Sequence, residues 1–216
     1  MNSFKPKYQE FINENFKGLK LRKPLFYNWK FGLRFNLQAE NINTEKYFEE
    51  VNKRAVAIFE TTFSNTDNIF LILTDYKFRR KKIRFSNYIF NQIDNLKKQE
   101  ISYSKVKKLY EPNDELDIRN IAAIKLTTKR LNYRNILSAI ANSDFLSRQP
   151  RYDKRGVFTD AEIYIINIDK KIIFNMYDDR GLDIICTDKD TIFPIYKKYN
   201  DWILDFDRKK IDNLFV

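Results

Sequence analysis

Three apolar runs separated by short polar turns lie close together near the C-terminal end of the sequence: Ile163–Ile168, Ile172–Tyr177 and Leu182–Cys186. The turns that join them contain three and four residues. Such short connections join antiparallel strands, because a parallel strand needs a crossover of a dozen or more residues. The pattern therefore predicts a three-stranded antiparallel meander, with Asp169–Lys171 as a hairpin turn.

Further strands are predicted upstream. Apolar and polar residues alternate from Trp29 to Leu37, which predicts a strand with one buried and one wet face. The wholly apolar run Ile69–Leu73 predicts a central strand buried on both faces, and Ile121–Leu126 predicts another strand. Residues 99–118 give no clear pattern beyond a turn or loop at Glu111–Glu115.

Helical spacing of apolar residues predicts helices over 3–16 (opened by Ser3 and ended by Gly18), over 44–59, over 87–98, from Asn132 to about 142–144, over 192–199 and in a short C-terminal segment. Pro194 is compatible only with a helix that starts late, since an interior proline removes a backbone hydrogen bond. Helices and strands do not alternate strictly, so the predicted class is α+β: a largely antiparallel sheet whose C-terminal meander is followed by helices.

The charge divides the chain into two regions. Residues 1–150 carry 28 Lys and Arg against 16 Asp and Glu, while residues 151–216 carry 12 against 13. We expect a basic α+β region over 1–146 and a β-meander with C-terminal helices over 160–216. The loop 147–159, which holds Pro150 and Gly156, lies between them, and the two regions together are expected to form one compact domain.

The composition excludes several classes of site. The 216 residues include no histidine, and Cys186 is the single cysteine. These counts exclude an internal disulfide, a cysteine-cluster metal site and a Ser-His-Asp triad. Glycine-rich phosphate-binding patterns are absent from the sequence. We therefore expect no cofactor and assign no catalytic residue, and Cys186, at the end of an apolar run, is predicted to be a small buried side chain.

The sequence contains no segment typical of membrane insertion or secretion. Its N-terminal residues are polar, unlike a signal peptide, and the apolar run Ile69–Leu73 is far too short to span a bilayer. A cytoplasmic protein with no membrane partner is the expectation.

The turn Asp178-Asp179-Arg180-Gly181, followed by Asp183, is a candidate partner-binding site. One interpretation is structural: Gly181 supplies a positive φ, an aspartate accepts from turn amides, and Arg180 offsets the acids. The other is a carboxylate cluster of Asp178, Asp179 and Asp183 that binds a divalent cation or a basic partner. Further acids for such a site could come from Asp205 and Asp207, although Asp207 can equally cap the C-terminal helix.

A second candidate surface is the basic segment Lys77–Arg84, whose six bases are Lys77, Arg79, Arg80, Lys81, Lys82 and Arg84. Aromatic residues are interleaved with them: Tyr76, Phe78, Phe85 and Tyr88. Bases that contact phosphates and aromatics that stack on nucleobases are typical of single-stranded nucleic-acid binding. The same charges suit an acidic protein partner or simply a solvated loop.

Three separated elements resemble an uncharacterised bacterial family, domain of unknown function 3885. They are the turn Tyr177–Asp183, the segment Asn200–Arg208 and the upstream element Ala139–Phe145, with weaker support from Gly32–Phe35. The similarity is concentrated in residues 130–216. It implies a compact cytoplasmic bacterial domain, and it brings no known activity and no known catalytic residue.

Three functions follow as hypotheses. The first is a non-catalytic bacterial cytoplasmic protein that binds another protein, most concretely an immunity protein that neutralises a cognate toxin. The second is a nucleic-acid-binding protein that uses residues 77–88. The third is a metal-dependent hydrolase at Asp178, Asp179 and Asp183.

Overall fold

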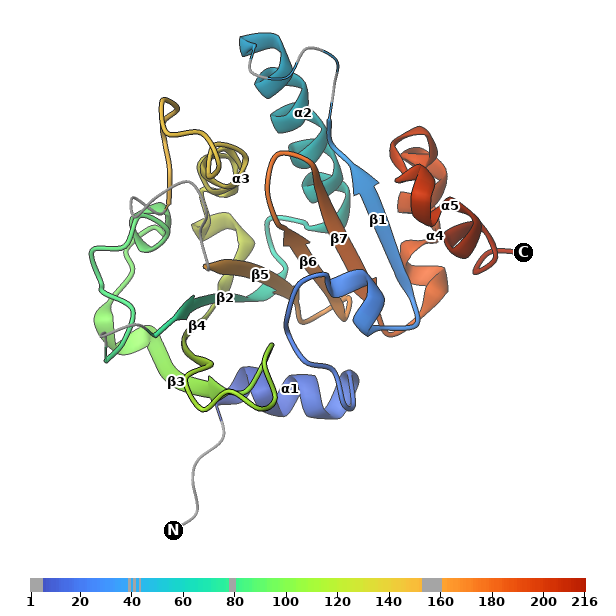
Figure 1. The fold of residues 1–216 in the computed structure, drawn as a ribbon. Coiled ribbons are helices and arrows are strands. Elements are labelled where there is room, and N and C mark those ends of the chain that lie inside the picture. The colour runs from blue at the N-terminus through green and yellow to red at the C-terminus, as the bar shows by residue number, and fades with distance from the viewer. Residues whose placement is uncertain (1–5, 39, 41, 43, 78–80, 153–160) are drawn as a thin grey trace.

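A seven-stranded antiparallel sheet forms the centre of the computed structural model, which describes residues 6–38, 40, 42, 44–77, 81–152 and 161–216 (Figure 1). The strand order is β1-β7-β6-β5-β2-β4-β3. The strands are β1 Gly32–Asn36, β2 Asn68–Tyr76, β3 Ile101–Lys107, β4 Ile118–Thr127, β5 Glu162–Asn167, β6 Ile172–Met176 and β7 Gly181–Cys186. Strands from both charge regions therefore share one sheet, since β1 pairs with β7 and β2 pairs with β5.

The predicted meander is confirmed by strands β5, β6 and β7. Ile173 of β6 lies between Ile166 of β5 and Ile185 of β7 in antiparallel register. All three strands are buried on both faces along their whole length. Helices follow the last strand, so the predicted α+β class is confirmed as well.

Strand β2 is central, as its continuous apolar run predicts. It pairs with β4 on one side and with β5 on the other. Its residues Ile69 and Leu71 enter the main core, which also contains Phe59 and Phe174, whereas Phe70 enters a second core. Each such side chain contributes about 1.5–3 kcal/mol to the stability of the fold when it is fully buried. A strand that is apolar on both faces is therefore most stable in the centre of the sheet, where both faces are covered.

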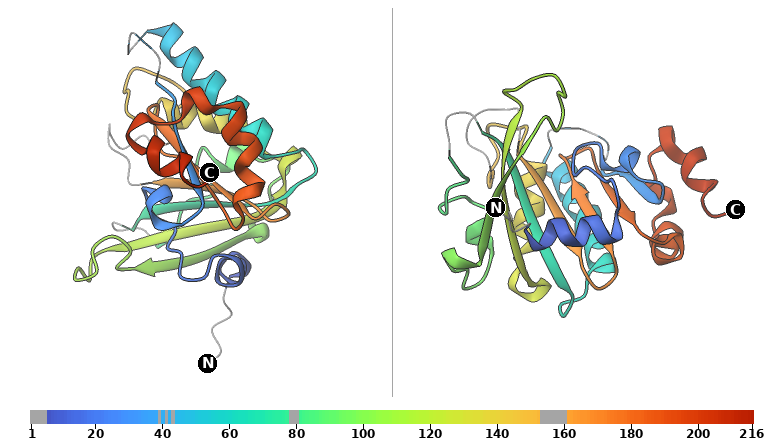
Figure 2. Two further views of the ribbon diagram at one scale, coloured as in Figure 1. Left: turned by 90° about the vertical axis from the view of Figure 1, so that its right-hand side faces the viewer. Right: turned by 90° about the horizontal axis from the view of Figure 1, so that it is seen from below.

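Helices cover both faces of the sheet (Figure 2). The main core receives side chains from α2 Glu45–Thr62, α3 Tyr133–Ala141, α4 Lys189–Lys198 and α5 Asp205–Asp212. Helix α1 Lys7–Asn15 lies on the opposite face, where Tyr8, Ile12 and Phe16 belong to a second cluster, the α1-side core. Helix α1 has Phe16 as its C-cap, and Gly18, the predicted end of the helix, lies two residues further on with a φ of 85°.

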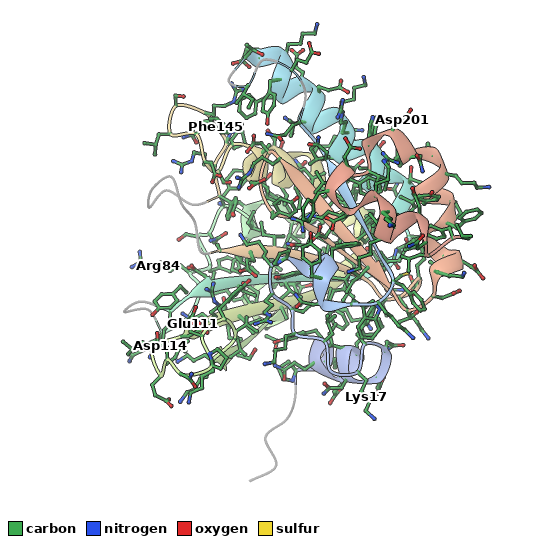
Figure 3. The ribbon with its side chains drawn as sticks, turned by 45° about the vertical axis from the view of Figure 1, so that its right-hand side comes forward. Lys17, Arg84, Glu111, Asp114, Phe145 and Asp201 are labelled. Carbon is green, nitrogen blue, oxygen red and sulfur yellow. The ribbon has the colours of Figure 1, made fainter. Side chains whose placement is uncertain are left out.

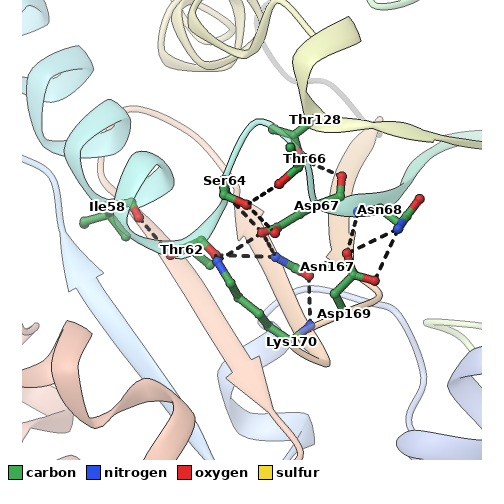
Figure 4. A network of polar contacts seen from close by, with 10 residues as sticks. All are labelled: Ile58, Thr62, Ser64, Thr66, Asp67, Asn68, Thr128, Asn167, Asp169 and Lys170. Carbon is green, nitrogen blue, oxygen red and sulfur yellow. Dashed lines mark hydrogen bonds and ion pairs between the residues drawn. The ribbon is translucent and has the colours of Figure 1, made fainter.

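The turn after α2 is joined to the β5–β6 hairpin by a polar network around Asp67 (Figure 4). Asp67 Oδ2 accepts hydrogen bonds from the Ser64 backbone N–H at 2.9 Å and from Asn167 Nδ2 at 2.6 Å. Lys170 Nζ lies 3.0 Å from the same oxygen. Burial alone would raise the pKa of Asp67, but the hydrogen bonds from Ser64, Lys170 and Asn167 lower it to about 2. The charged carboxylate of Asp67 therefore stabilises the contact between the turn after α2 and the β5–β6 hairpin.

Two local predictions are wrong. Residues 87–98 form no α-helix; the structure has short 3-10 turns at Phe90–Gln92 and Lys98–Glu100, because Ile93 pairs with Leu131 and Asn95 has a φ of 52°. Strand β3 occupies the segment that gave no clear pattern, since its pairing with β4 outweighs its own polar sequence.

The second error concerns α4, which begins early, at Lys189, so that Pro194 lies inside it. The Asp188 side chain caps this helix by accepting from the Asp190 N–H at 3.2 Å. Burial of Ile192 and Ile195 offsets the one backbone bond that the proline removes.

Some predictions lie outside the described residues: the helix opening at Ser3, the bases Arg79 and Arg80 with Phe78, and residues 153–159 of the loop. In the part of the chain that the structure does describe, no helix combines the length and apolar character needed to cross a bilayer.

Candidate functional site

The turn between β6 and β7 holds Asp178 and Arg180 in a closed local arrangement. Asp178 Oδ1 accepts from the Arg180 backbone N–H at 2.8 Å, and Oδ2 accepts from Arg180 Nε at 2.8 Å and from Nη2. The side chain of Asp178 is 8% exposed, whereas that of Arg180 is 62% exposed. The acid is thus buried beneath the guanidinium that it holds, and only the base reaches the surface.

Asp179 and Asp144 complete an acidic cluster with Asp178. Carboxylate oxygens of the three residues lie within 4.8 Å of one another. The Tyr47 hydroxyl of α2 donates to Asp179 Oδ2. Burial raises the pKa of both Asp144 and Asp179, and the charge of Asp178 raises each of them further. Because the acids repel one another, part of the cluster's stability depends on Arg180.

Asp183 lies in a different environment, on strand β7. Its Oδ2 accepts from the Phe26 N–H at 3.0 Å, and its Oδ1 lies 3.5 Å from Arg34 Nε. Burial raises the pKa of Asp183 to about 6, although Arg34 acts in the opposite direction. The predicted trio of Asp178, Asp179 and Asp183 is therefore not brought together; Asp144 takes the third place.

The two acids near the C-terminus also act separately from the turn. Asp207 accepts from the Tyr27 hydroxyl at 2.8 Å and lies 3.9 Å from Arg34 Nε. The N-cap position of α5 is Leu204, so the predicted capping role of Asp207 is wrong. Asp205 is exposed and forms an ion pair with Arg208 at 3.3 Å.

Gly181 does not have the predicted positive φ. In the described part of the chain, the glycine with that conformation is Gly18. The turn needs glycine for a different reason. A Cβ atom at Gly181 would meet the Tyr177 hydroxyl and would lie 2.5 Å from the Phe35 carbonyl oxygen of β1. Close approach of two strands, and not backbone conformation, selects glycine here.

The basic segment lies beside the edge strand β3. Lys81, Lys82 and Arg84 are exposed, and Lys77 is half-buried. Lys82 Nζ lies 5.0 Å from the centre of the Tyr103 ring on β3. Lys105 and Lys107 are exposed and lie two and four residues after Tyr103 on β3. Every second residue of a strand points to the same side of the sheet, so these two lysines lie on the side of Tyr103. We call Lys81, Lys82, Arg84, Lys105 and Lys107 the basic strip.

The described aromatic residues near the basic segment, Tyr76, Phe85 and Tyr88, are engaged with the rest of the protein. Phe85 and Tyr88 pack against the main core, and Phe85 contacts Phe90 with ring centres 6.4 Å apart. The Tyr76 hydroxyl donates to the Leu116 carbonyl at 2.8 Å. Among the described residues of this surface, the charges are therefore more accessible than the rings.

Cys186 is buried as predicted. Its thiol donates to the Asp188 carbonyl at 2.8 Å, and burial raises its pKa to about 12. A thiol with this pKa is a poor nucleophile at neutral pH.

Sequence reasoning missed Asp144 and Tyr47 as members of the acidic cluster. Asp144 belongs to the element Ala139–Phe145 that resembles the family pattern, so a signal for its proximity to the turn was present. Tyr47 has no comparable signal, because only the packing of α2 brings its hydroxyl to Asp179.

Chemically, three carboxylates at this spacing are suited to binding a hard cation, and here Arg180 already supplies a positive charge to Asp178. Replacing Asp144 by Asn should therefore raise the free energy of unfolding by about 0.5 kcal/mol at neutral pH, because it removes one repelling charge. Because the pKa of Asp144 is raised in the fold, the charged side chain destabilises the protein increasingly as pH rises. The stabilisation by Asp144→Asn should therefore vanish near pH 3, where the wild-type acid is protonated.

Thermal melts at both pH values measure this effect, with the exposed Asp201→Asn as a control that should change little (Figure 3). If magnesium, manganese or calcium stabilised the wild type and Asp144→Asn melted several degrees lower, the cluster would be a cation site, as the hydrolase hypothesis requires.

Comparison with known proteins identifies the family. The chain matches the pattern of the family described as Domain of unknown function (DUF3885) over residues 8–207. It is also similar to a Bacillus subtilis (strain 168) protein named uncharacterized protein YnaE, with 30% identity over 210 residues that cover 91% of this chain and 96% of the relative. No solved structure matches the chain. The resemblance seen at Ala139–Phe145, Tyr177–Asp183 and Asn200–Arg208 is thereby confirmed, and this chain belongs to the domain of unknown function family DUF3885.

Proposed function

We propose that this protein is a non-catalytic bacterial cytoplasmic binding protein whose partner is another protein with an acidic surface. An immunity protein that neutralises a cognate toxin is the most concrete form of this proposal. The observation that carries it is the basic strip, in which exposed charges of the 81–84 segment lie beside the exposed lysines of β3. Clustered charge of one sign steers association with a surface of the opposite sign.

The inward packing of Phe85 and Tyr88 favours a protein partner over single-stranded nucleic acid. Binding of a single strand derives much of its affinity from bases stacked on accessible aromatic rings. Here Phe85 and Tyr88 contribute to the core, whereas Lys81, Lys82 and Arg84 are exposed. Acidic protein surfaces require the charges alone.

The candidate partner-binding set Asp178, Asp179, Arg180 and Asp183 has a narrower role in this proposal. The three acids are buried, and Arg180 is the member whose side chain reaches the surface. Asp178 would act by holding Arg180 in place for a partner.

Changing Lys81, Lys82 and Arg84 together to Ser should reduce capture of the partner from an extract of the source cells by at least about tenfold, because clustered contacts between opposite charges are lost. The matched control changes Lys17, Lys46 and Lys209 to Ser, which removes the same net charge from exposed positions elsewhere. Figure 3 shows Lys17 far from Arg84. Both variants should melt like the wild type.

Three results would count against the proposal: no protein recovered at stoichiometric yield at low or moderate salt, equal capture by both triple variants, or capture abolished by nuclease. In the last case the partner would be nucleic acid. Its binding should then weaken steeply with salt, because each neutralised phosphate releases a counterion.

A further inference from the structure

A cavity of about 240 Å³ lies between α1 and the sheet, on the face opposite to α2 and α3. Ile72 and Thr74 of β2 and Ile121 of β4 line it from the sheet, and Tyr8 and Ile12 line it from α1. Figure 2 shows α1 alone lying across this face among the labelled helices of Figure 1. The cavity is therefore a gap in the α1-side core, lined mainly by apolar side chains.

One residue of this lining carries a buried polar atom that lacks a partner. Thr74 is 1% exposed, and its Oγ1 makes no hydrogen bond within the part of the chain that the structure describes. The neighbouring polar groups are already engaged: Ser104 Oγ lies 3.3 Å from the Tyr8 hydroxyl, and the Glu162 carboxylate accepts from Tyr110 and Tyr164. A buried hydroxyl without a partner is costly, so a ligand that bonds to it gains affinity.

We infer that this cavity is a binding site for a small apolar molecule with one neutral hydroxyl group, which bonds to Thr74 Oγ1. An apolar cavity of about 150 Å³ holds benzene, so this volume suits roughly ten non-hydrogen atoms. Glu162 pairs directly opposite Thr74 across β5 and β2, with Arg119 Nη1 3.8 Å from its carboxylate. Because this carboxylate disfavours a second negative charge beside Thr74, the ligand's hydroxyl is a neutral one. A water molecule is a poor substitute, since it needs two to four polar partners.

The rim of the cavity fits the same ligand class. Gln9, Asn13 and Lys20 lie around it and provide polar contacts toward solvent, while Leu19 and Leu21 extend the apolar wall after α1. A molecule with an apolar body and a single buried hydroxyl satisfies both parts of this lining.

The test is a calorimetric titration of the full chain with para-cresol and with toluene, which differ by the hydroxyl group. The wild type should bind para-cresol more tightly than toluene. Thr74→Val should weaken para-cresol binding about fivefold and leave toluene binding unchanged, because it removes the hydroxyl and keeps the size of the side chain. Since Thr74 Oγ1 has no partner, this variant should melt no lower than the wild type.

A second variant, Leu21→Trp, fills the cavity and should abolish binding of both probes; Leu19→Phe replaces it if it does not fold. The inference is overturned if neither probe binds the wild type, if Thr74→Val weakens both probes equally, or if cavity filling leaves binding intact. The triple variant of the basic strip should bind para-cresol like the wild type, so this test and the partner experiment fail independently.

Discussion

Replacing Gly181 by Ala should lower the free energy of unfolding by about 3 kcal/mol or more, which makes it one of the most damaging single changes in the chain. The added Cβ would lie 2.5 Å from the Phe35 carbonyl oxygen, and it would also meet the Tyr177 ring. The carbonyl belongs to the backbone of β1, so it cannot move without disturbing the pairing of β1 with β7. Gly181→Val should be no better, because the first carbon already clashes.

Two other glycines provide matched controls for this prediction. A Cβ at Gly32 would come no closer than 3.1 Å to its neighbours, and one at Gly18 would meet nothing within 4 Å. Gly18→Ala should cost about 1–2 kcal/mol through its positive φ alone. Urea unfolding of the three alanine variants measures the order. A Gly181→Ala protein as stable as Gly32→Ala would contradict the close-approach explanation.

The aspartates of the same turn should tolerate substitution far better. Asp178→Asn and Asp179→Asn should each change the free energy of unfolding by less than about 1 kcal/mol. The amide keeps the size of the acid and one acceptor oxygen, the guanidinium of the lost pair with Arg180 is largely exposed, and removing a charge relieves the repulsion within the acidic cluster. A loss of partner capture by these variants without a change in melting would assign them to binding.

Replacing Arg34 by Met should destabilise the protein by about 3 kcal/mol at about pH 8, because it leaves a buried carboxylate without its counter-charge. The side chain of Asp183 is 0% exposed, and Arg34 Nε lies 3.5 Å from its Oδ1. The Arg34 guanidinium also lies 5.1 Å from the Tyr27 ring centre and 5.3 Å from that of Tyr177. Met keeps much of the apolar contact with these rings, so the loss reports mainly on charge.

The pH dependence distinguishes this loss from ordinary packing damage. The pKa of Asp183 is raised to about 6 in the fold, above its ordinary value of about 4, so its contribution to stability falls as pH rises through this window. Without Arg34 the pKa rises further, and the decline continues to higher pH. The effect of Arg34→Met should therefore be several-fold smaller at about pH 5, where Asp183 is largely protonated, than at about pH 8.

Urea unfolding at both pH values checks this, and Asp183→Asn in the Arg34→Met background should remove the pH dependence. The Asn side chain can still accept from the Phe26 N–H. An equal loss at both pH values would show that Arg34 stabilises the fold through packing alone.

Much of the architecture was determined by local sequence signals. The short turns between Ile163 and Cys186 permit little besides an antiparallel meander, and the unbroken apolar run of β2 requires a central position. These features could be predicted because chain length and side-chain periodicity act over a few neighbouring residues. The family could be recognised for the same reason, from short elements such as Tyr177–Asp183.

Tertiary structure alone decided which of these residues meet. Asp183 is two residues from Gly181, yet strand alternation and pairing with β1 carry it to Arg34, while the end of α3 brings Asp144 to Asp178 and Asp179. Glycine at 181 is required by a carbonyl oxygen of β1, far away in the sequence. Strand β3 forms because β4 offers it a partner, despite a sequence with weak periodicity. Contacts between distant segments depend on how the sheet and helices pack, which no local pattern encodes.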